Sequence, residues 1–583
     1  MKLEITPSQV ELIPTTMKEI HALEKFPGFV GRGKYLMANK PPVLRNILSR
    51  LPADVVVKLP PDLLEKTTLK EVSTNFPFHT TPLRHQMIAL RYLITNRGGG
   101  LLLDPGLGKT KIALDYIFYS RFKRVLIICP KPLMFVWEDE IATHRPELSF
   151  TTFNTTEWAD HADLTKRVWI MNYRKAVMLL PDIMDTQFDA IFIDEGLVKN
   201  PSSDQTTAIT LLSKLVPVRV IMSGTLVNNS EIDLFAPVRI LEPSLVGGSY
   251  TAFRDQYFHV WSPNKADPNI KAVSGAKDKD MMRGILRSCS LIMRKEEWLE
   301  LPEKTFIERE VEMPPMTAKH YYELLSNYVT RIDKLIIECE NPLALMCKLS
   351  QISNGFLYEN EDGFDELMIE KPPRKKGTRA KKGRPTFFFP HQPKIQELQK
   401  ILLVDEPEER IIVWYTMSAE RDMIEAMLTA NGITFLTIAG GDKKLREKVR
   451  EFNEQSHIKV LLCQAKTLNY GVTLLGNKGT EYSESEEDDV SLRSINLNDR
   501  ICVQVFFSLT TSLEVFLQQQ DRIHRIGQTK PCRYYLILSN SPVEQMLVSR
   551  LKDRIEIRQF MLEDILNKAR NEFSYVTSPS LVS

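Results

Sequence analysis

The chain has 583 residues, 43% of them hydrophobic and 26% charged, which is typical of a globular protein with sizeable cores. Its formal net charge of +2 excludes a strong overall field, so a bound nucleic acid would need a local basic channel. The scattered cysteines have no zinc-ligand spacing and no apolar run reaches the ~18 residues that cross a bilayer, so we expect an intracellular, unanchored protein.

The pattern along the chain predicts an α/β fold with two parallel-sheet lobes. From residue 81, short apolar runs alternate with turns and helical stretches, as in the buried parallel strands of an open sheet. Strands are expected at residues 100–103, 125–129, 168–171, 190–193 and 218–222, and again at 411–415, 434–438, 459–463, 503–507 and 534–538. The predicted domains are 1–80 (small accessory module), 81–245 (first lobe), 246–390 (helical insertion and basic linker), 391–565 (second lobe) and 566–583 (tail).

A glycine-rich turn follows the first expected strand. Its residues are Asp104, Pro105, Gly106, Leu107, Gly108, Lys109 and Thr110, with a helix expected from Lys111. Such a turn directs backbone N–H groups and a helix dipole at a phosphate. Lys109 would reach the β- and γ-phosphates and Thr110 would hold magnesium, so the pattern predicts an ATP site. Leu103 stands where the usual first glycine would be, and a glycine turn without a ligand is the alternative.

Two carboxylates end a second apolar run of the same lobe. Asp194 and Glu195 follow the run Ala-Ile-Phe-Ile at residues 190–193. At the carboxyl end of a parallel strand, Asp194 can hold magnesium and Glu195 can orient the attacking water. The alternative is the N-cap of a helix with acidic residues in its first turn. The phosphate loop earlier in the lobe favours the catalytic interpretation.

The ordered motifs resemble those of the Swi/Snf family of DNA translocases, within helicase superfamily two. The similar segments are 82–86, with Gln86 at the adenine-contacting position; 125–140, ending in Val-Trp-Glu-Asp-Glu; Asp194-Glu195 with Lys199-Asn200; Ser223-Gly224-Thr225 with Asn229; Arg294 with 301–304; and 518–528, Gln-Gln-Gln-Asp-Arg-Ile-His-Arg-Ile-Gly-Gln. The resemblance covers about residues 81–550. It implies two RecA-like lobes, ATP hydrolysis with magnesium, and movement along duplex DNA without full strand separation.

The last of these segments adds an arginine pair to the predicted catalytic set. Arg522 and Arg525 are three residues apart, which would place them on one face of a helix. Facing the nucleotide of the other lobe, they can stabilise charge on the transferred phosphate. A surface helix with charges at this spacing is the alternative. The predicted catalytic residues are therefore Lys109, Asp194, Glu195, Arg522 and Arg525.

The departures from the family pattern concern the coupling of ATP hydrolysis to movement rather than the catalysis of hydrolysis. Gly196 and Leu197 stand where the family has a sequence ending in His, Leu226 replaces a proline, and Thr473 replaces an asparagine. None of these positions supplies a catalytic atom, so hydrolysis is still expected. The positions bear on how hydrolysis drives movement.

The family places nucleic-acid contacts near its motifs, and the corresponding residues here are Lys131, Tyr173, Lys199, Thr225, Lys466 and Gly471. The two lysines of the first lobe could instead be solvated charges, and Tyr173 could be core packing. Contacts to the phosphate backbone carry no sequence code, so binding to duplex or branched DNA is expected to be largely independent of sequence and sensitive to salt. No membrane partner is expected, and protein partners are not predicted. A cytoplasmic location is favoured, in a bacterium or a phage-infected host, or a nuclear one if the chain is eukaryotic.

Two other activities stay open from the sequence alone. One is a helicase of the same superfamily that separates strands. The other is a scaffold that binds ATP and DNA without moving, which the loss of the family's His at position 197 leaves open. The basic stretch 371–385 is interpreted as a loop or linker and the acidic stretch 481–489 as an insertion.

Overall fold

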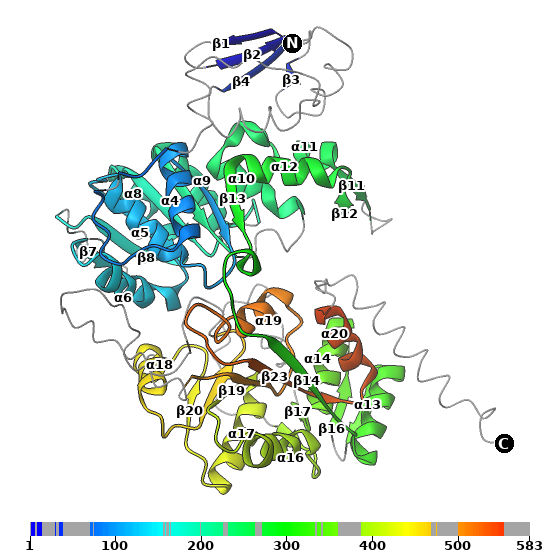
Figure 1. Ribbon diagram of the computed structural model, residues 1–583. Helices are drawn as coiled ribbons and strands as arrows, with labels where there is room; N and C mark the ends of the chain where they lie inside the picture. The colour runs from blue at the N-terminus through cyan, green and yellow to red at the C-terminus, as the bar shows by residue number, and fades with distance from the viewer. Residues whose placement is uncertain are drawn as a thin grey trace, which may run out of the picture. The chain divides into compact units, whose positions relative to one another are not determined.

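The computed structural model describes most of the two predicted lobes. Its described residues are 2–5, 9–13, 29–30, 34–38, 70–73, 75–154, 158, 163, 165–196, 198, 200–224, 231–262, 271–332, 335–339, 342–358, 386–442, 444–467, 474 and 500–552. The chain forms two compact units, Met1–Leu299 and Glu300–Ser583, and each is described by itself (Figure 1).

A small antiparallel sheet lies within the predicted accessory module. Its strands are β1 (Lys2–Ile5), β2 (Gln9–Ile13), β3 (Phe29–Val30) and β4 (Lys34–Ala38), in the order β1-β2-β4-β3.

The first unit is organised around a seven-stranded sheet in which neighbouring strands are parallel (Figure 1). In spatial order its strands are β13 (Ser290–Met293), β5 (Gly98–Leu103), β10 (Val218–Met222), β9 (Ala190–Asp194), β6 (Val125–Cys129), β8 (Val168–Asn172) and β7 (Phe150–Thr152). All residues of β6 and β9 are buried. Continuous apolar runs of this kind suit strands that are covered on both faces.

Helices connect these strands. They are α4 (Arg84–Asn96), α5 (Lys109–Tyr119), α6 (Met134–His144), α7 (Tyr173–Met178), α8 (Leu180–Asp185), α9 (Asp204–Leu215), α10 (Phe235–Leu241), α11 (Tyr250–Tyr257) and α12 (Lys279–Cys289), with short 3-10 turns η1 (Lys131–Leu133), η2 (Glu231–Leu234), η3 (Pro243–Leu245) and η4 (Lys295–Glu297). A two-stranded hairpin, β11 (Phe258–Trp261) and β12 (Ala272–Ala276), follows α11. Local polar residues set several helix starts, because the side chains of Asn172, Ser203 and Asp278 each accept a bond from a backbone N–H three residues later.

The second unit contains a six-stranded parallel sheet. Its strands, in spatial order, are β14 (Lys304–Val311), β23 (Cys532–Ser539), β22 (Val503–Phe506), β19 (Ile411–Tyr415), β21 (Val460–Gln464) and β20 (Phe435–Ile438). Its helices are α13 (Pro315–Asn327), α14 (Pro342–Ser353), α16 (Pro393–Lys400), α17 (Ser418–Ala430), α18 (Leu445–Glu454), α19 (Leu513–Gln520) and α20 (Pro542–Lys552), with a π turn η5 (Ile401–Asp405). Two hairpins complete it: β15 (Val329–Ile332) with β16 (Leu335–Glu338), and β17 (Phe356–Tyr358) with β18 (Thr386–Phe388).

The predicted fold class is confirmed, since both sheets are parallel and helices alternate with their strands. Every strand predicted in the two lobes is present within two residues at either end. The segment 246–390, predicted as one helical insertion, is divided between the units: β13 joins the first sheet and β14 joins the second. The sequence of β14, Lys-Thr-Phe-Ile-Glu-Arg-Glu-Val, is rich in charge because the strand lies at an edge of its sheet, and it therefore lacks the apolar run of a central strand.

All seven cysteines are free and buried. Within the described ranges, no helix is long and apolar enough to cross a membrane.

Candidate nucleotide-binding site

Three neighbouring strands of the first unit bring the predicted nucleotide residues to one edge of the sheet. β10 lies between β5 and β9, and its Met222 pairs with Leu101 on one side and Asp194 on the other. The glycine-rich loop follows β5, Asp194 ends β9, and Gly224 lies just after β10. The carboxyl ends of parallel strands are the usual place for a ligand in such a sheet.

The loop from Asp104 to Gly108 is held by its surroundings. The Asp104 backbone N–H donates to the Met293 carbonyl oxygen at 3.1 Å, and its carboxylate accepts from the Lys295 N–H at 3.0 Å. A Cβ at position 224 would lie 2.8 Å from the Pro105 ring, so the close approach of the two loops requires glycine there. Asp104 and Pro105, predicted to bind the nucleotide, therefore have a role in shaping the loop.

The loop ends in a left-handed residue at the start of α5. Gly106 and Gly108 have φ angles of 92° and 77°, which favour glycine, and Gly108 is the N-cap of the helix. The Lys109 ammonium donates to the Leu103 carbonyl oxygen at 2.9 Å, across the loop. The loop therefore presents a helix N-terminus and a lysine on the same side, as phosphate binding requires.

Two side chains of α4 contact the same loop. His85 Nε2 donates to the Leu107 carbonyl oxygen at 2.9 Å, because a carbonyl can only accept, and Gln86 Nε2 lies 3.4 Å from the same oxygen. Gln86 Oε1 accepts from the Leu83 N–H at 2.9 Å. A Cβ at Gly108 would lie 2.3 Å from Gln86 Nε2. The structure thus places Gln86 against the phosphate loop, and its adenine contact stays a prediction.

Asp194 is a buried carboxylate with two hydrogen-bond donors. Trp137 Nε1 in α6 donates to one carboxylate oxygen at 2.9 Å, and the Glu195 N–H donates to the other at 3.0 Å. The pKa of Asp194 is raised to about 7, because burial and, to a lesser extent, the charge of Glu195 raise it more than the charge of Lys109 and the two hydrogen bonds lower it. The carboxylate therefore lies in a position where additional positive charge would stabilise it.

Magnesium fits this donor set. A carboxylate and the hydroxyl of Thr110, at the first turn of α5, are oxygen ligands of the kind that magnesium uses together with substrate phosphates and water. Within the described residues, no group of three or more His, Cys, Asp and Glu side chains could hold a metal ion by itself. A metal at Asp194 would consequently depend on the phosphates of the nucleotide.

Glu195 follows the strand in a left-handed conformation. Its φ angle is 55° and that of Gly196 is 38°, so the chain turns sharply at the end of β9. A non-glycine residue rarely adopts this conformation, and such residues cluster at functional sites. The direction of the half-buried Glu195 side chain is therefore set by the turn and does not follow the alternation of the strand. Leu197, the other departure in this motif, lies outside the described residues.

The prediction that Arg522 and Arg525 share a helix face is wrong. α19 ends at Gln520, and residues 521–527 form turns. Gly527 has a φ of 93°, and Gln528 Nε2 donates to two backbone carbonyl oxygens at 2.9 and 3.1 Å. The first of these bonds, to Ile501, ties the segment to another part of its unit, and the second, to Ile523, lies within the segment. Arg522 is buried and Arg525 is half-buried.

The predicted nucleic-acid residues have different environments. Tyr173 is 4% exposed, and its hydroxyl donates to the Asp194 carbonyl oxygen at 2.6 Å, so it supports the end of β9 instead of presenting a polar atom to DNA. Lys131 is exposed after β6, and Lys466 is half-buried after β21. Lys199, Thr225 and Gly471 lie outside the described residues.

Three contributors to the site were not predicted in these roles: His85, Trp137 and Tyr173. Both Trp137 and His85 lie within segments that the sequence singled out, at 125–140 and 82–86. The sequence of those segments does not show the contact of Trp137 with Asp194, because β6 and β9 become neighbours only in the folded sheet. Nor does it show the contact of His85 with Leu107, because α4 meets the loop only in the folded unit.

Comparison with known proteins agrees with these motifs. A family model described as SNF2-related domain matches residues 82–355. An uncharacterized ATP-dependent helicase of Mycoplasma pneumoniae is 23% identical over 509 residues, covering 85% of this chain and 42% of its own length. The ISWI chromatin-remodeling complex ATPase ISW2 of Saccharomyces cerevisiae is 21% identical over 506 residues, covering 82% of this chain and 40% of its own.

The chain thus spans less than half the length of each of these curated relatives. Among solved structures, the Sulfolobus solfataricus SWI2/SNF2 ATPase core in complex with dsDNA matches with a TM-score of 0.36 and 17% identity, covering 86% of this chain and 97% of that one.

Proposed function

Residues 82–355 carry the SNF2-related domain, which makes this chain a member of that family, and from that premise we propose that it is a DNA-dependent ATPase that moves along double-stranded or branched DNA. The observation that carries the proposal is the meeting of the phosphate loop with Asp194 and Glu195 at one edge of a parallel sheet. That arrangement is the one needed for hydrolysis of a nucleoside triphosphate.

Several site residues of the first unit have a part in this proposal. Lys109 and the N–H groups at the start of α5 bind the phosphates, and Thr110 and Asp194 hold magnesium. Bound magnesium supplies positive charge to the phosphate oxygens. Glu195 orients the attacking water. Trp137 and Tyr173 keep Asp194 in place through its carboxylate and its backbone carbonyl.

The second unit supplies positive charge in this proposal. Arg522 and Arg525 are proposed to stabilise the charge that develops on the transferred phosphate. Nucleotide-driven changes between open and closed states then move the protein along the DNA backbone. Contacts to phosphates make this movement independent of sequence.

A steady-state ATPase assay tests the proposal. The protein is assayed with no polymer, duplex DNA, branched DNA, single-stranded DNA and RNA, alongside Glu195→Gln and the exposed-site control Asp185→Asn. We expect stimulation by duplex or branched DNA, loss of about 100-fold or more in Glu195→Gln, and no change in Asp185→Asn. Movement is then checked by displacement of a third strand from a DNA triplex.

Three outcomes would contradict the proposal in different ways. Stimulation by single strands or RNA alone would indicate a strand-separating or RNA helicase. ATP binding without hydrolysis on any polymer would indicate a scaffold. Hydrolysis without triplex displacement would leave an ATPase that does not translocate.

A further inference from the structure

The hairpin β11–β12 presents an exposed tryptophan on the first unit. Phe258, at the start of β11, is 1% exposed and belongs to the hydrophobic core, whereas Trp261, at its end, is 51% exposed. The pairing slips by one residue between His259 and Val260, opposite Gly275 with its φ of 155°. Irregularities of this kind bend a strand and redirect its side chains. The hairpin is therefore anchored at its base and offers an aromatic side chain to solvent at its other end.

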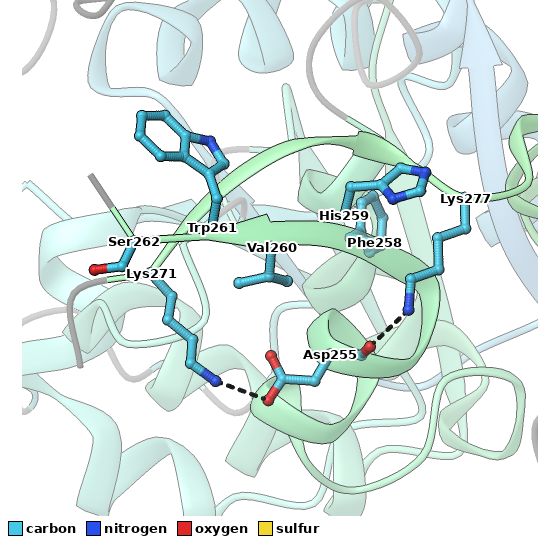
Figure 2. A pocket seen from close by; sticks show the side chains of 8 residues that line it. All are labelled: Asp255, Phe258, His259, Val260, Trp261, Ser262, Lys271 and Lys277. Carbon is cyan, nitrogen blue, oxygen red and sulfur yellow. Dashed lines mark hydrogen bonds and ion pairs between the residues drawn. The ribbon is translucent and has the colours of Figure 1, made fainter. Parts of the chain in front are cut away.

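The two sides of the hairpin differ in chemistry. Figure 2 shows the Trp261 indole and the His259 ring on one side of β11, and Val260 pointing to the other, where Asp255 lies between Lys271 and Lys277. A hollow of about 470 Å³ lies against these residues. This volume is within the range of sites that hold a small molecule or a single nucleotide, ~300–1,000 Å³.

The charged groups beside the hollow leave an excess of positive charge. The Asp255 carboxylate is shared by Arg254 at 2.8 Å and Lys271 at 3.6 Å. The Lys277 ammonium donates to the backbone carbonyl oxygens of Asp255 and Gln256 at 3.0 and 3.2 Å, which do not neutralise it. Two cations therefore share the Asp255 carboxylate, and Lys277 adds a third positive charge at the same hollow. The hydrogen bond from Arg254 lowers the pKa of Asp255, so this count holds at neutral pH.

We propose that this hairpin is a second DNA-binding site, one that takes an unpaired nucleotide where a duplex ends or branches. Base stacking on an exposed aromatic ring accepts any base, because every base has a π-face. Lys271 and Lys277, which line the same hollow as Trp261 but lie on the other side of β11, neutralise phosphates of the bound strand. A hairpin with an exposed indole on one side and an excess of cations on the other is complementary to a polyanion that also carries aromatic rings, as a nucleic acid does. The inference rests on the proposed DNA-dependent function and adds to it a preference for DNA with unpaired ends.

The test compares two DNA substrates by fluorescence anisotropy. Wild-type protein and Trp261→Ala bind a blunt duplex and the same duplex with a single-stranded tail, and Leu215→Ala, which removes a 56% exposed side chain from α9, is the matched control. We expect Trp261→Ala to weaken tailed-duplex binding about 10-fold and blunt-duplex binding less than about 2-fold. Trp261→Phe should keep most of the affinity, and Leu215→Ala should bind both substrates like the wild type.

The contribution of the lysines to DNA binding is measured separately, through the salt dependence of the affinity. Lys271→Met should lower the slope of log affinity against log salt concentration by about one on the tailed duplex, whereas the control Lys214→Met, at an exposed position of α9, should not. Thermal unfolding of each variant checks that the fold is intact.

The outcomes separate this inference from the proposed function. Equal binding of the tailed duplex by wild type and Trp261→Ala, or equal weakening on both substrates, would overturn the hairpin site while duplex-stimulated ATP hydrolysis stays intact. Failure of the wild type to bind either DNA would overturn the proposed function, and the hairpin inference with it.

Discussion

The indole of Trp137 donates a hydrogen bond to the carboxylate of Asp194 over 2.9 Å, joining residues that are 57 positions apart in the chain. Trp137 lies in α6, directly after β6, and Asp194 ends β9, the neighbour of β6 in the sheet. The bond fixes one oxygen of the carboxylate that we assign to magnesium. It therefore links a motif defined only by its sequence to the geometry of the nucleotide site.

Replacement of Trp137 by Phe should lower kcat for ATP hydrolysis about 10-fold. A hydrogen bond to a charged group contributes roughly 1.5–3 kcal/mol, and loss of ~1.4 kcal/mol from the transition state slows a reaction tenfold. The measurement is steady-state ATPase activity as a function of magnesium concentration.

Trp169→Phe is the matched control for this change. Trp169 is as deeply buried in the same unit, but its indole donates to the Lys166 carbonyl oxygen at 3.1 Å, away from Asp194. Both variants should lose similar stability, and only Trp137→Phe should change the magnesium dependence. An equal effect of both on activity would reduce the role of Trp137 to packing.

Tyr173→Phe should destabilise the first unit by about 1 kcal/mol and leave DNA affinity unchanged. The change removes only the hydroxyl that donates to the Asp194 carbonyl oxygen, and one such bond contributes about this much. Thermal unfolding and DNA-binding anisotropy measure the two effects. A large loss of DNA affinity would restore the sequence-based prediction of a direct contact.

Lys131→Ala should have the opposite effects, with unchanged stability and weaker DNA binding. Its side chain is exposed at the carboxyl edge of the sheet, so its removal should not affect stability. If it contacts a DNA phosphate, affinity should fall for all sequences alike and the salt slope should decrease by about one. Titrations of two unrelated duplexes at several salt concentrations would show this, and unchanged slopes would exclude the contact.

Asp115→Asn should cost about 3–5 kcal/mol of stability. Asp115, on the helix that begins at the phosphate loop, is 2% exposed and accepts from the Lys111 ammonium at 2.7 Å and from Arg145 Nε at 2.8 Å. Loss of its charge would leave the buried Lys111 without this counter-ion and the buried Arg145 with only the more exposed Glu147, at 3.3 Å. Urea unfolding followed through the first transition measures the change.

Arg145→Met is the informative comparison for that variant. It leaves Asp115 paired with Lys111, and it removes the guanidinium that lies 4.4 Å from the Phe118 ring centre and 4.9 Å from that of Phe76. We therefore expect a smaller loss of stability than for Asp115→Asn. The reverse order would mean that the ring contacts of Arg145 outweigh the ion pair.

The stability of the first unit should depend on pH through His85. Burial lowers the pKa of His85 below its ordinary value of 6.5. Between the folded pKa and 6.5 the unfolded chain binds more protons than the folded one, so the stabilisation is present above 6.5 and is lost as pH falls through the folded pKa. His85→Gln should remove this dependence.

The readout is the difference in unfolding free energy between wild type and His85→Gln at pH 7.5 and pH 5.5. Asp194 contributes with the opposite sign, because its raised pKa, about 7, makes the folded state hold the extra proton. That contribution is common to both proteins and cancels in the difference. A difference that does not change with pH would show that the His85 ring is not held neutral.

The sequence was most informative where a residue's role is local. Runs such as Val-Leu-Ile-Ile-Cys and Ala-Ile-Phe-Ile-Asp are apolar throughout, which only a strand covered on both faces requires. The phosphate loop is equally local, because the left-handed conformations of Gly106 and Gly108 and the spacing to Lys109 depend on a few consecutive residues. Such features could be predicted because no distant partner decides them.

The errors concern features that distant partners decide. The helix α19 ends at Gln520, before Arg522, and Gln528 ties the segment that follows to the Ile501 carbonyl oxygen elsewhere in its unit. Tyr173 was predicted as a DNA contact with core packing as the alternative, and its place in the chain could not show the 2.6 Å bond that turns its hydroxyl inward. Likewise β14 belongs to a sheet whose other strands come more than 90 residues later.

By itself, then, the sequence determined the α/β fold class, the positions of the buried strands, the phosphate loop and the resemblance to a family of ATP-driven motors. Only the tertiary structure decided that Trp137, Tyr173 and His85 hold the nucleotide residues, and that Trp261 stands exposed on the hairpin that carries Lys271. Hydrophobic periodicity and turn chemistry are properties of neighbouring residues. Hydrogen bonds between strands far apart in the chain, and the exposure of one side chain among many, exist only after the sheets have formed.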